Sequence, residues 1–144
     1  DVLGSRGLGD VYKRQVHVLD EFNNFMEEEI YQMMVATTED QDELILENTT
    51  TLKVARWWNK ACDIIPCNGG KDIGIQKILD YFNFNKEEAM AFGDGGNDIS
   101  MLKYVGTGVA MGNAKDNVKA IADYITDSVQ EDGIVSALKH FEII

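Results

Sequence analysis

Hydrophobic and polar positions follow two different patterns along the chain, and the change falls near Pro66. Residues 30–36 form an apolar run that predicts a strand. Residues 37–48 combine a threonine, early acids and a Leu-Ile-Leu stretch, which predicts a helix with one packed face. Residues 52–58 and 60–66 each predict a short strand. The part of the chain before residue 67 therefore contains three predicted strands and one predicted helix.

From residue 67 onward, amphipathic helices and short apolar strands alternate regularly. In the first of these helices, the side chains of Ile75, Ile78, Leu79 and Phe82 are expected to lie on one helical face. Such alternation is typical of parallel strands joined by crossover helices, so the predicted fold class is α/β, with residues 67–144 forming half of a doubly wound, Rossmann-like sheet. Helices are expected over residues 71–83, 97–105, 114–122 and 130–141, and strands over 88–94, 107–111 and 123–127.

Residues 1–15 follow neither pattern. The stretch DVLGSRGLGDVYKRQ contains three glycines and alternating charges, with no sustained hydrophobic period. We expect it to be a non-native or disordered leader and exclude it from the fold. The remaining chain is divided into a first domain over residues 16–66 and a second over residues 67–144.

Composition restricts the possible partners. The 144 residues carry a net charge of −12, which argues against nucleic acid or an anionic membrane surface as the main partner. The sequence contains no run of about 18 apolar residues, the length that a membrane span needs, and no signal-peptide pattern, so we expect a cytoplasmic protein. Cys62 and Cys67 lack a second pair of ligands at zinc-site spacing and are expected to be reduced thiols.

The stretch AFGDGGNDISML, residues 91–102, carries the most specific chemistry. Asp94 stands where a predicted strand ends, and the neighbouring glycines allow the backbone to approach a ligand closely. A helix that begins near Asn97 adds a favourable field for anions. Hard oxygen ligands beside a helix N-terminus suit a magnesium-bound phosphate. The residues alone also allow a simpler interpretation, in which Asp98 caps the helix and the glycines only turn the chain.

Three other phosphate or metal motifs do not fit. An EF-hand loop that starts at Asp94 would need an acid where Gly96 stands. A dinucleotide-binding loop would need a glycine in place of Asp98. A Walker loop that ends at Lys71 would need serine or threonine in place of Asp72.

Taken together, GDGGNDISML after a strand, GVAMGNA shortly downstream, and Lys71 at the start of the preceding helix resemble the haloacid dehalogenase superfamily. Within it they are similar to the Cof-type sugar phosphatases, which have a large inserted cap of type IIB. The resemblance covers about residues 30–144. It implies that residues 16–66 are a partial α+β cap and that residues 67–144 are the C-terminal half of the hydrolase core. It also implies magnesium-dependent hydrolysis of small phosphorylated metabolites, such as sugar phosphates, through an aspartyl-phosphate.

The resemblance also assigns roles to individual residues. Asp94 would be a magnesium ligand, and Asp98 would be the second acid, which helps to hold the metal shell and the lysine. Asn97 would contact the substrate or its phosphate. Lys71 would neutralise the phosphoryl oxygens and restrain the attacking carboxylate. The chain departs from the family at Asp72, where the family usually has glycine after the lysine; Asp72 could pair with Lys71 or cap the helix.

The attacking carboxylate of the family lies in a DxDGT motif after an apolar strand, and the chain has no match to it. Asp20 has an apolar lead, but Phe22 stands at the acid position and no Gly-Thr follows. Asp40 and Asp42 lie in a charged helical stretch. The phosphate-binding serine or threonine of the family cannot be located either. The chain is therefore expected to be a C-terminal fragment that is inactive alone.

Two other functions are compatible with the sequence. The phosphorylation domain of a P-type ion pump uses a similar GDGxND turn, but such pumps carry many membrane helices near it. An acidic, non-catalytic domain could instead bind a partner through Trp57 and Trp58. The sequence indicates neither a particular phosphorylated substrate nor an oligomeric state.

Overall fold

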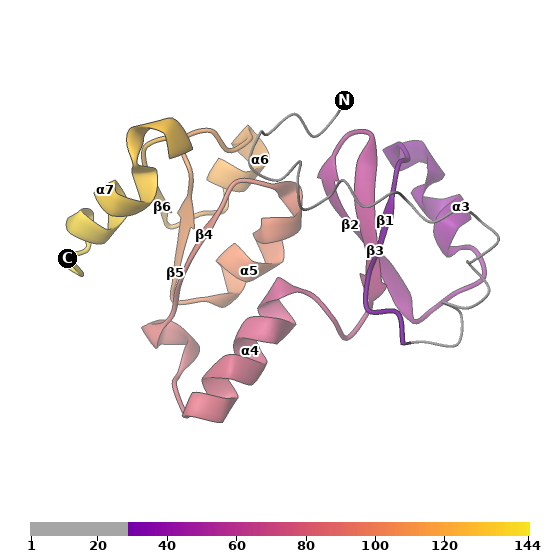
Figure 1. Cartoon of the computed structure of the whole chain (residues 1–144), viewed down its shortest axis with the longest axis horizontal. Coiled ribbons are helices and arrows are strands. Elements are labelled where there is room, and N and C mark those ends of the chain that lie inside the picture. Colours follow the sequence, from indigo (N-terminus) through magenta and orange to yellow (C-terminus); the bar gives the residue numbers. More distant parts are fainter. Residues whose placement is uncertain (1–28) are drawn as a thin grey trace, which may run out of the picture. The chain divides into compact units, whose positions relative to one another are not determined.

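The computed structural model describes residues 29–144 (Figure 1). Asp20 and the predicted leader over residues 1–15 lie outside the described residues. Residues 31–144 form one compact unit, and the description that follows concerns this unit. That unit contains two three-stranded sheets.

The first sheet is antiparallel and has the strand order β1-β3-β2. Strands β2 (Leu52–Trp58) and β3 (Ala61–Pro66) form a hairpin, and the short β1 (Met33–Val35) pairs with the other edge of β3. A 3-10 turn, η2 (Glu39–Gln41), and helix α3 (Asp42–Leu46) connect β1 to β2, as Figure 1 shows. These elements confirm the strands and the helix that the hydrophobic pattern predicts for this part of the chain.

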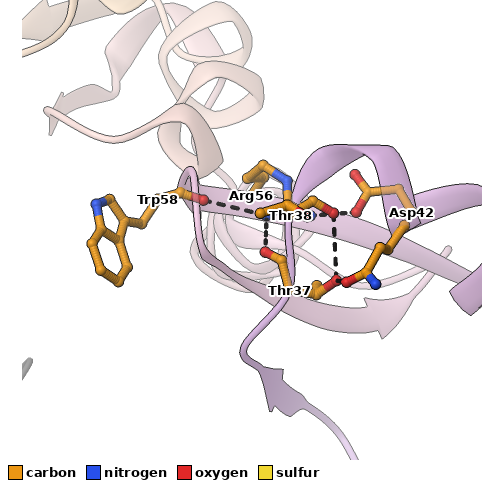
Figure 2. A network of polar contacts seen from close by, with 6 residues as sticks. Thr37, Thr38, Asp42, Arg56 and Trp58 are labelled. Carbon is orange, nitrogen blue, oxygen red and sulfur yellow. Dashed lines mark hydrogen bonds and ion pairs between the residues drawn. The ribbon is translucent and has the colours of Figure 1, made fainter.

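The guanidinium of Arg56 fixes the loop before α3 to strand β2 (Figure 2). Its Nη1 donates to the carbonyl oxygens of Thr37, at 2.8 Å, and Trp58, at 3.3 Å, while Nη2 pairs with the carboxylate of Asp42. The hydrogen bond to Asp42 raises the pKa of Arg56 above its ordinary value. The Thr37 hydroxyl also donates to Gln41 Oε1 at 2.6 Å. Asp42 is therefore held by Arg56, which agrees with its exclusion as a nucleophile.

The second sheet is parallel, with the strand order β4-β5-β6, which confirms the predicted α/β class. Gly93, the last residue of β4, pairs with Ala110, the last residue of β5. Helices separate the strands along the chain, as expected for crossover connections. The elements are α4 (Lys71–Phe82), η3 (Lys86–Glu88), β4 (Met90–Gly93), η4 (Gly96–Asp98), α5 (Ile99–Tyr104), β5 (Thr107–Ala110), α6 (Asp116–Lys119), β6 (Tyr124–Ile125), η5 (Val129–Glu131) and α7 (Gly133–His140).

The core of this second sheet is built largely from small side chains. The buried cluster consists of Ala91, Leu102, Val105, Ala110, Ala114 and Val118. Small residues allow α5 and α6 to approach the strands closely, and this close packing holds the loop after β4 in place. No helix within residues 29–144 has both the length and the apolar character to cross a membrane.

In this half the apolar face of one helix is only partly buried, and the predicted bounds of another helix are wrong. On α4, Ile75 packs against the core, but the side chains of Ile78 and Phe82 are 59% and 61% exposed. Hydrophobic periodicity marks the apolar stripe of a helix but does not indicate which of its residues have a packing partner. The helix predicted over residues 114–122 is limited to α6, because the chain has to return to the sheet before β6 begins.

Candidate active site

The carboxyl end of β4 carries the candidate site. Asp94 follows the last residue of β4 directly, and the chain then enters η4 and α5. The parallel register places the end of β5 beside it, and the backbone N–H of Met111 donates to the Gly93 carbonyl at 2.9 Å. Ligand sites of open parallel sheets lie at this edge.

Asp98 holds the loop closed. Its side chain is buried, with a residue exposure of 5%, and its Oδ2 accepts hydrogen bonds from the backbone N–H groups of Asp94, at 3.1 Å, and Gly95, at 3.0 Å. Its Oδ1 pairs with the ammonium of Lys71. One carboxylate therefore fixes the turn after β4 and ties it to the start of α4.

Lys71 reaches this turn because it is the first residue of α4. The preceding residue, Gly70, has φ 128°, a conformation that favours glycine and that lets the chain turn sharply into the helix. The Lys71 side chain is 50% exposed, so its ammonium contacts Asp98 and remains accessible to a ligand. The structure thus brings Lys71 and Asp98 together, as the sequence analysis expects, while their catalytic roles stay predictions.

Opposing effects act on the ionisation of Asp98. Burial raises the pKa of its carboxyl, but the Lys71 ammonium and the two backbone donors outweigh this and hold the pKa below its ordinary value of 3.8. Asp98 is therefore charged at neutral pH. Because its pKa is lower in the folded chain than in the unfolded chain, its ionisation stabilises the fold above about pH 4. That stabilisation is lost as the pH falls through the folded pKa, below 3.8.

We expect Asp98→Asn to lower the free energy of unfolding by about 1–3 kcal/mol at pH 7, because it removes the charged partner of Lys71 and weakens the two backbone contacts. The difference from wild type should shrink as the pH falls below about 4, because the wild-type carboxylate is protonated first in the unfolded chain and, at a lower pH, in the folded chain. Urea unfolding at pH 7 and at pH 3 measures both values. Asp80→Asn, an exposed change on α4, is the control. If the two proteins differ in free energy of unfolding by the same amount at both pH values, the stabilisation does not come from the charged form of Asp98.

Asp94 is exposed, and only one of its oxygens is engaged. Its Oδ2 accepts a hydrogen bond from Asn113 Nδ2 at 2.9 Å, whereas Oδ1 has no hydrogen-bond partner among residues 29–144. A free carboxylate oxygen is a ligand that Mg²⁺ accepts. The described residues contain no group of three or more His, Cys, Asp and Glu side chains able to hold a metal ion. The donor type fits Mg²⁺, and this part of the chain supplies a partial set of ligands.

A pocket of about 610 Å³ lies beside the loop and is lined by strands β2 and β3, by the start of α4, and by residues of η4 and α5. Lys71, Asn97 and Ser100 line it from one side, and Lys53 and Arg56 from strand β2. The ammonium of Lys53 lies 3.6 Å from the position that a Cβ atom would have at residue 70, next to Lys71. Lys53 and Lys71 therefore bring two ammonium groups to the pocket, which Asp63 and Asp72 also line. The guanidinium of Arg56 is already bound to Thr37, Trp58 and Asp42.

Strand β2 contacts the loop closely at Gly96. A Cβ atom at this position would lie 2.8 Å from the carbonyl oxygen of Arg56, so a side chain here would clash with the β2 backbone. Asn97, the next residue, faces the pocket, and it has no hydrogen-bond partner within the described part of the chain. Its amide is available to a ligand, so its predicted substrate contact fits the geometry.

Asp72 neither pairs with Lys71 nor caps α4. The Ser100 hydroxyl donates to Asp72 Oδ1 at 3.2 Å, which links α4 to α5. The N-cap residue of α4 is Gly70, and no side chain makes a capping hydrogen bond to this helix. The departure from the family pattern at residue 72 therefore leaves the Lys71–Asp98 pair intact.

Asn113 is the residue at this site that the sequence analysis missed. It lies in the GVAMGNA stretch, just after β5, and its amide is the side-chain donor to Asp94. Its position after β5 could have revealed it, because residues that follow adjacent parallel strands meet at one edge of the sheet.

Comparison with known proteins identifies the family. The sequence model of the haloacid dehalogenase-like hydrolases matches residues 9–138. The chain belongs to this family. The match begins inside residues 1–15, and the limits of the leader and of the two domains stay predictions.

Three relatives show how much of a family member the chain represents. The Bacillus subtilis (strain 168) protein YkrA is 40% identical over 116 residues, 81% of this chain and 45% of that protein. The 5-amino-6-(5-phospho-D-ribitylamino)uracil phosphatase YcsE of the same organism is 49% identical over 71 residues, 49% of this chain and 28% of that protein. The solved structure of the HAD subclass IIB sugar phosphatase BT4131 has a TM-score of 0.79 and 44% identity, and covers 85% of this chain and 47% of that chain. The chain thus spans about half the length of YkrA and BT4131, or less in the case of YcsE.

Proposed function

We propose that the protein to which this chain belongs is a magnesium-dependent phosphatase that hydrolyses phosphomonoesters of small metabolites. The observation that supports this most directly is the ion pair between Lys71 and Asp98 beside the free carboxylate oxygen of Asp94, at the carboxyl end of a parallel strand. A cation for the phosphoryl oxygens and an acid for a metal ion are the charges that phosphoryl transfer requires.

Each side chain has a distinct role in this proposal. Asp94 would hold Mg²⁺ through its free oxygen, and the bound ion would neutralise negative charge on the phosphoryl group. Lys71 binds the phosphoryl oxygens, and Asp98 orients the Lys71 ammonium while it holds the loop closed. Because both Asp98 oxygens already have partners, its contribution to the metal shell is indirect in this proposal. Asn97 contacts the substrate from the wall of the pocket.

We place the attacking carboxylate outside residues 29–144. Within them, Asp42 is paired with Arg56, and Asp40 lies in the exposed 3-10 turn before it. In the proposed reaction that carboxylate attacks phosphorus, the P–O bond to the metabolite breaks and the metabolite leaves as its alcohol, and water then hydrolyses the aspartyl-phosphate to inorganic phosphate and the free carboxylate. The 144-residue chain alone is expected to be inactive, because it supplies the charge compensation but not the nucleophile.

The pocket supports a small anionic metabolite as the substrate. Lys53 stands on the wall formed by β2, where the part of the substrate beyond the phosphate would lie. YcsE is named for a phosphorylated ribitylamino compound and BT4131 for sugar phosphates, so we propose a phosphorylated sugar or sugar-like metabolite. The acidic composition supports the lack of a nucleic-acid partner, and a cytoplasmic location is part of the same proposal.

The full-length protein should release phosphate from sugar phosphates in the presence of Mg²⁺ and stop when EDTA is added. We expect turnover of at least one member of a sugar-phosphate panel, measured as released inorganic phosphate, and restoration of activity when excess Mg²⁺ follows the EDTA. The 144-residue chain serves as the matched comparison and should show none. Turnover that EDTA leaves unchanged, or no turnover of any phosphomonoester, would reject the proposed function.

A further inference from the structure

Asn113 connects Asp94 to the loop between β6 and α7. Its Nδ2 donates to Asp94 Oδ2 at 2.9 Å, and its Oδ1 accepts from the backbone N–H of Val129 at 3.1 Å. The two partners are of opposite kinds, since a carboxylate only accepts and a backbone N–H only donates. They therefore fix the orientation of the amide, and asparagine suits both contacts at once.

The loop that presents Val129 is itself well anchored. The buried hydroxyl of Thr126 donates to the Gly133 carbonyl at 2.6 Å, which closes the loop between β6 and α7. The backbone N–H of Gly112, the residue before Asn113, donates to the carbonyl of Asp127 at 3.0 Å. The Val129 N–H is thus fixed with respect to residues 112 and 113, so it can hold the Asn113 amide in one place.

We propose that Asn113, anchored by the Val129 N–H, is a positioning residue that orients Asp94 for a divalent cation. It engages one carboxylate oxygen, Oδ2, and leaves Oδ1 as the ligand. This inference rests on the proposed function, in which Asp94 binds Mg²⁺. It adds that the affinity for Mg²⁺ depends on a contact made by the β6–α7 loop.

A purely structural role explains these contacts less well. Asp94 and Asn113 are both exposed, so their hydrogen bond contributes little to the stability of the fold. An exposed aspartate without a partner would sample several rotamers, and binding a metal ion would have to restrict them. A hydrogen bond that selects one orientation in advance lowers this cost. Residues that orient metal ligands in this way typically change metal affinity by about 10–100-fold when removed.

Two variants break the two ends of the connection separately. Asn113→Ala removes both contacts. Val129→Pro removes only the backbone N–H that anchors the amide. Val129 is the first residue of η5, a position that tolerates proline, and Ser128 before it is extended, with φ −69° and ψ 165°, as a residue before proline should be. The Val129 side chain is 61% exposed, so its loss removes little packing.

The experiment measures the dissociation constant for Mg²⁺ by isothermal titration calorimetry on the full-length protein, together with the thermal midpoint. Asn113→Ala is expected to weaken Mg²⁺ binding about 10-fold. Val129→Pro should weaken it by a smaller factor, because the hydrogen bond to Asp94 remains but is no longer anchored. Asn117→Ala, an exposed asparagine on α6, is the matched control and should bind like wild type.

The outcomes separate this inference from the proposed function. Asp94→Asn should abolish Mg²⁺ binding; if it does not, the proposed metal site is wrong. If Asp94→Asn abolishes binding while Asn113→Ala and Val129→Pro keep the wild-type dissociation constant, the metal site stands and the positioning role is rejected. A lower thermal midpoint with unchanged Mg²⁺ affinity would also reject it, because a residue that only supports the loop would give that result.

Discussion

Lys71→Met is expected to lower kcat/KM of the full-length protein in the proposed phosphatase reaction by about 10³-fold, which corresponds to about 4 kcal/mol of transition-state stabilisation. Methionine preserves much of the length and the apolar part of the side chain and removes the charge. Phosphoryl transfer depends mainly on positioning and on neutralising the charge of the phosphoryl oxygens, and Lys71 is the cation that the structure places beside the loop after β4.

Most of this loss should appear in activity rather than in stability. The Lys71 side chain is 50% exposed, so its ion pair with Asp98 is partly screened by solvent. In the variant, Asp98 keeps its two backbone donors and continues to close the loop. Its pKa should rise toward the ordinary value, because burial is then opposed by the backbone hydrogen bonds alone.

Released phosphate under saturating Mg²⁺ and the thermal midpoint together measure this prediction. Lys77→Met is the matched control, since Lys77 lies on the same helix and is exposed. It should retain wild-type kinetics. A Lys71→Met enzyme within tenfold of wild-type kcat/KM would show that charge compensation comes from another group, and Lys53 in the same pocket would be the next candidate.

The parallel sheet could be predicted from the sequence because its strands are short, apolar and separated by helical segments. The predicted strands over residues 88–94, 107–111 and 123–127 contain β4, β5 and β6. The exposed apolar side chains of α4 could not be foreseen, because Ile78 and Phe82 satisfy the helical period as well as Ile75 does. Hydrophobic periodicity identifies the apolar face of a helix, whereas the burial of each residue depends on which other parts of the protein pack against that face.

The candidate site was predictable to a different degree for each residue. Asp94 and Asp98 lie in one motif, and Lys71 was placed beside them only through the family resemblance, since 27 residues separate it from Asp98. Asn113 was missed because neither its spacing nor its residue type is distinctive. Its contact with Asp94 arises from the parallel register, in which Gly93 pairs with Ala110 and the following residues converge.

Asp94→Asn is the second change with a large expected effect. We expect it to abolish measurable Mg²⁺ binding and to lower kcat by about 10³-fold or more, because an amide oxygen is a much weaker ligand for a hard cation than a carboxylate. The fold should be preserved. The new side chain keeps an oxygen that can accept the hydrogen bond from Asn113, and the backbone N–H of residue 94 still donates to Asp98.

Calorimetric titration with Mg²⁺ and phosphate-release assays over a range of Mg²⁺ concentrations measure the two effects. Asp116→Asn, an exposed acid on α6, makes the same change in net charge and should leave both unchanged. Wild-type Mg²⁺ affinity in Asp94→Asn would place the metal elsewhere. This variant removes the charge of residue 94 while it keeps the contact with Asn113, and Asn113→Ala keeps the charge while it removes the contact. If charge provides most of the binding energy and orientation a smaller part, the first variant must weaken Mg²⁺ binding far more than the second.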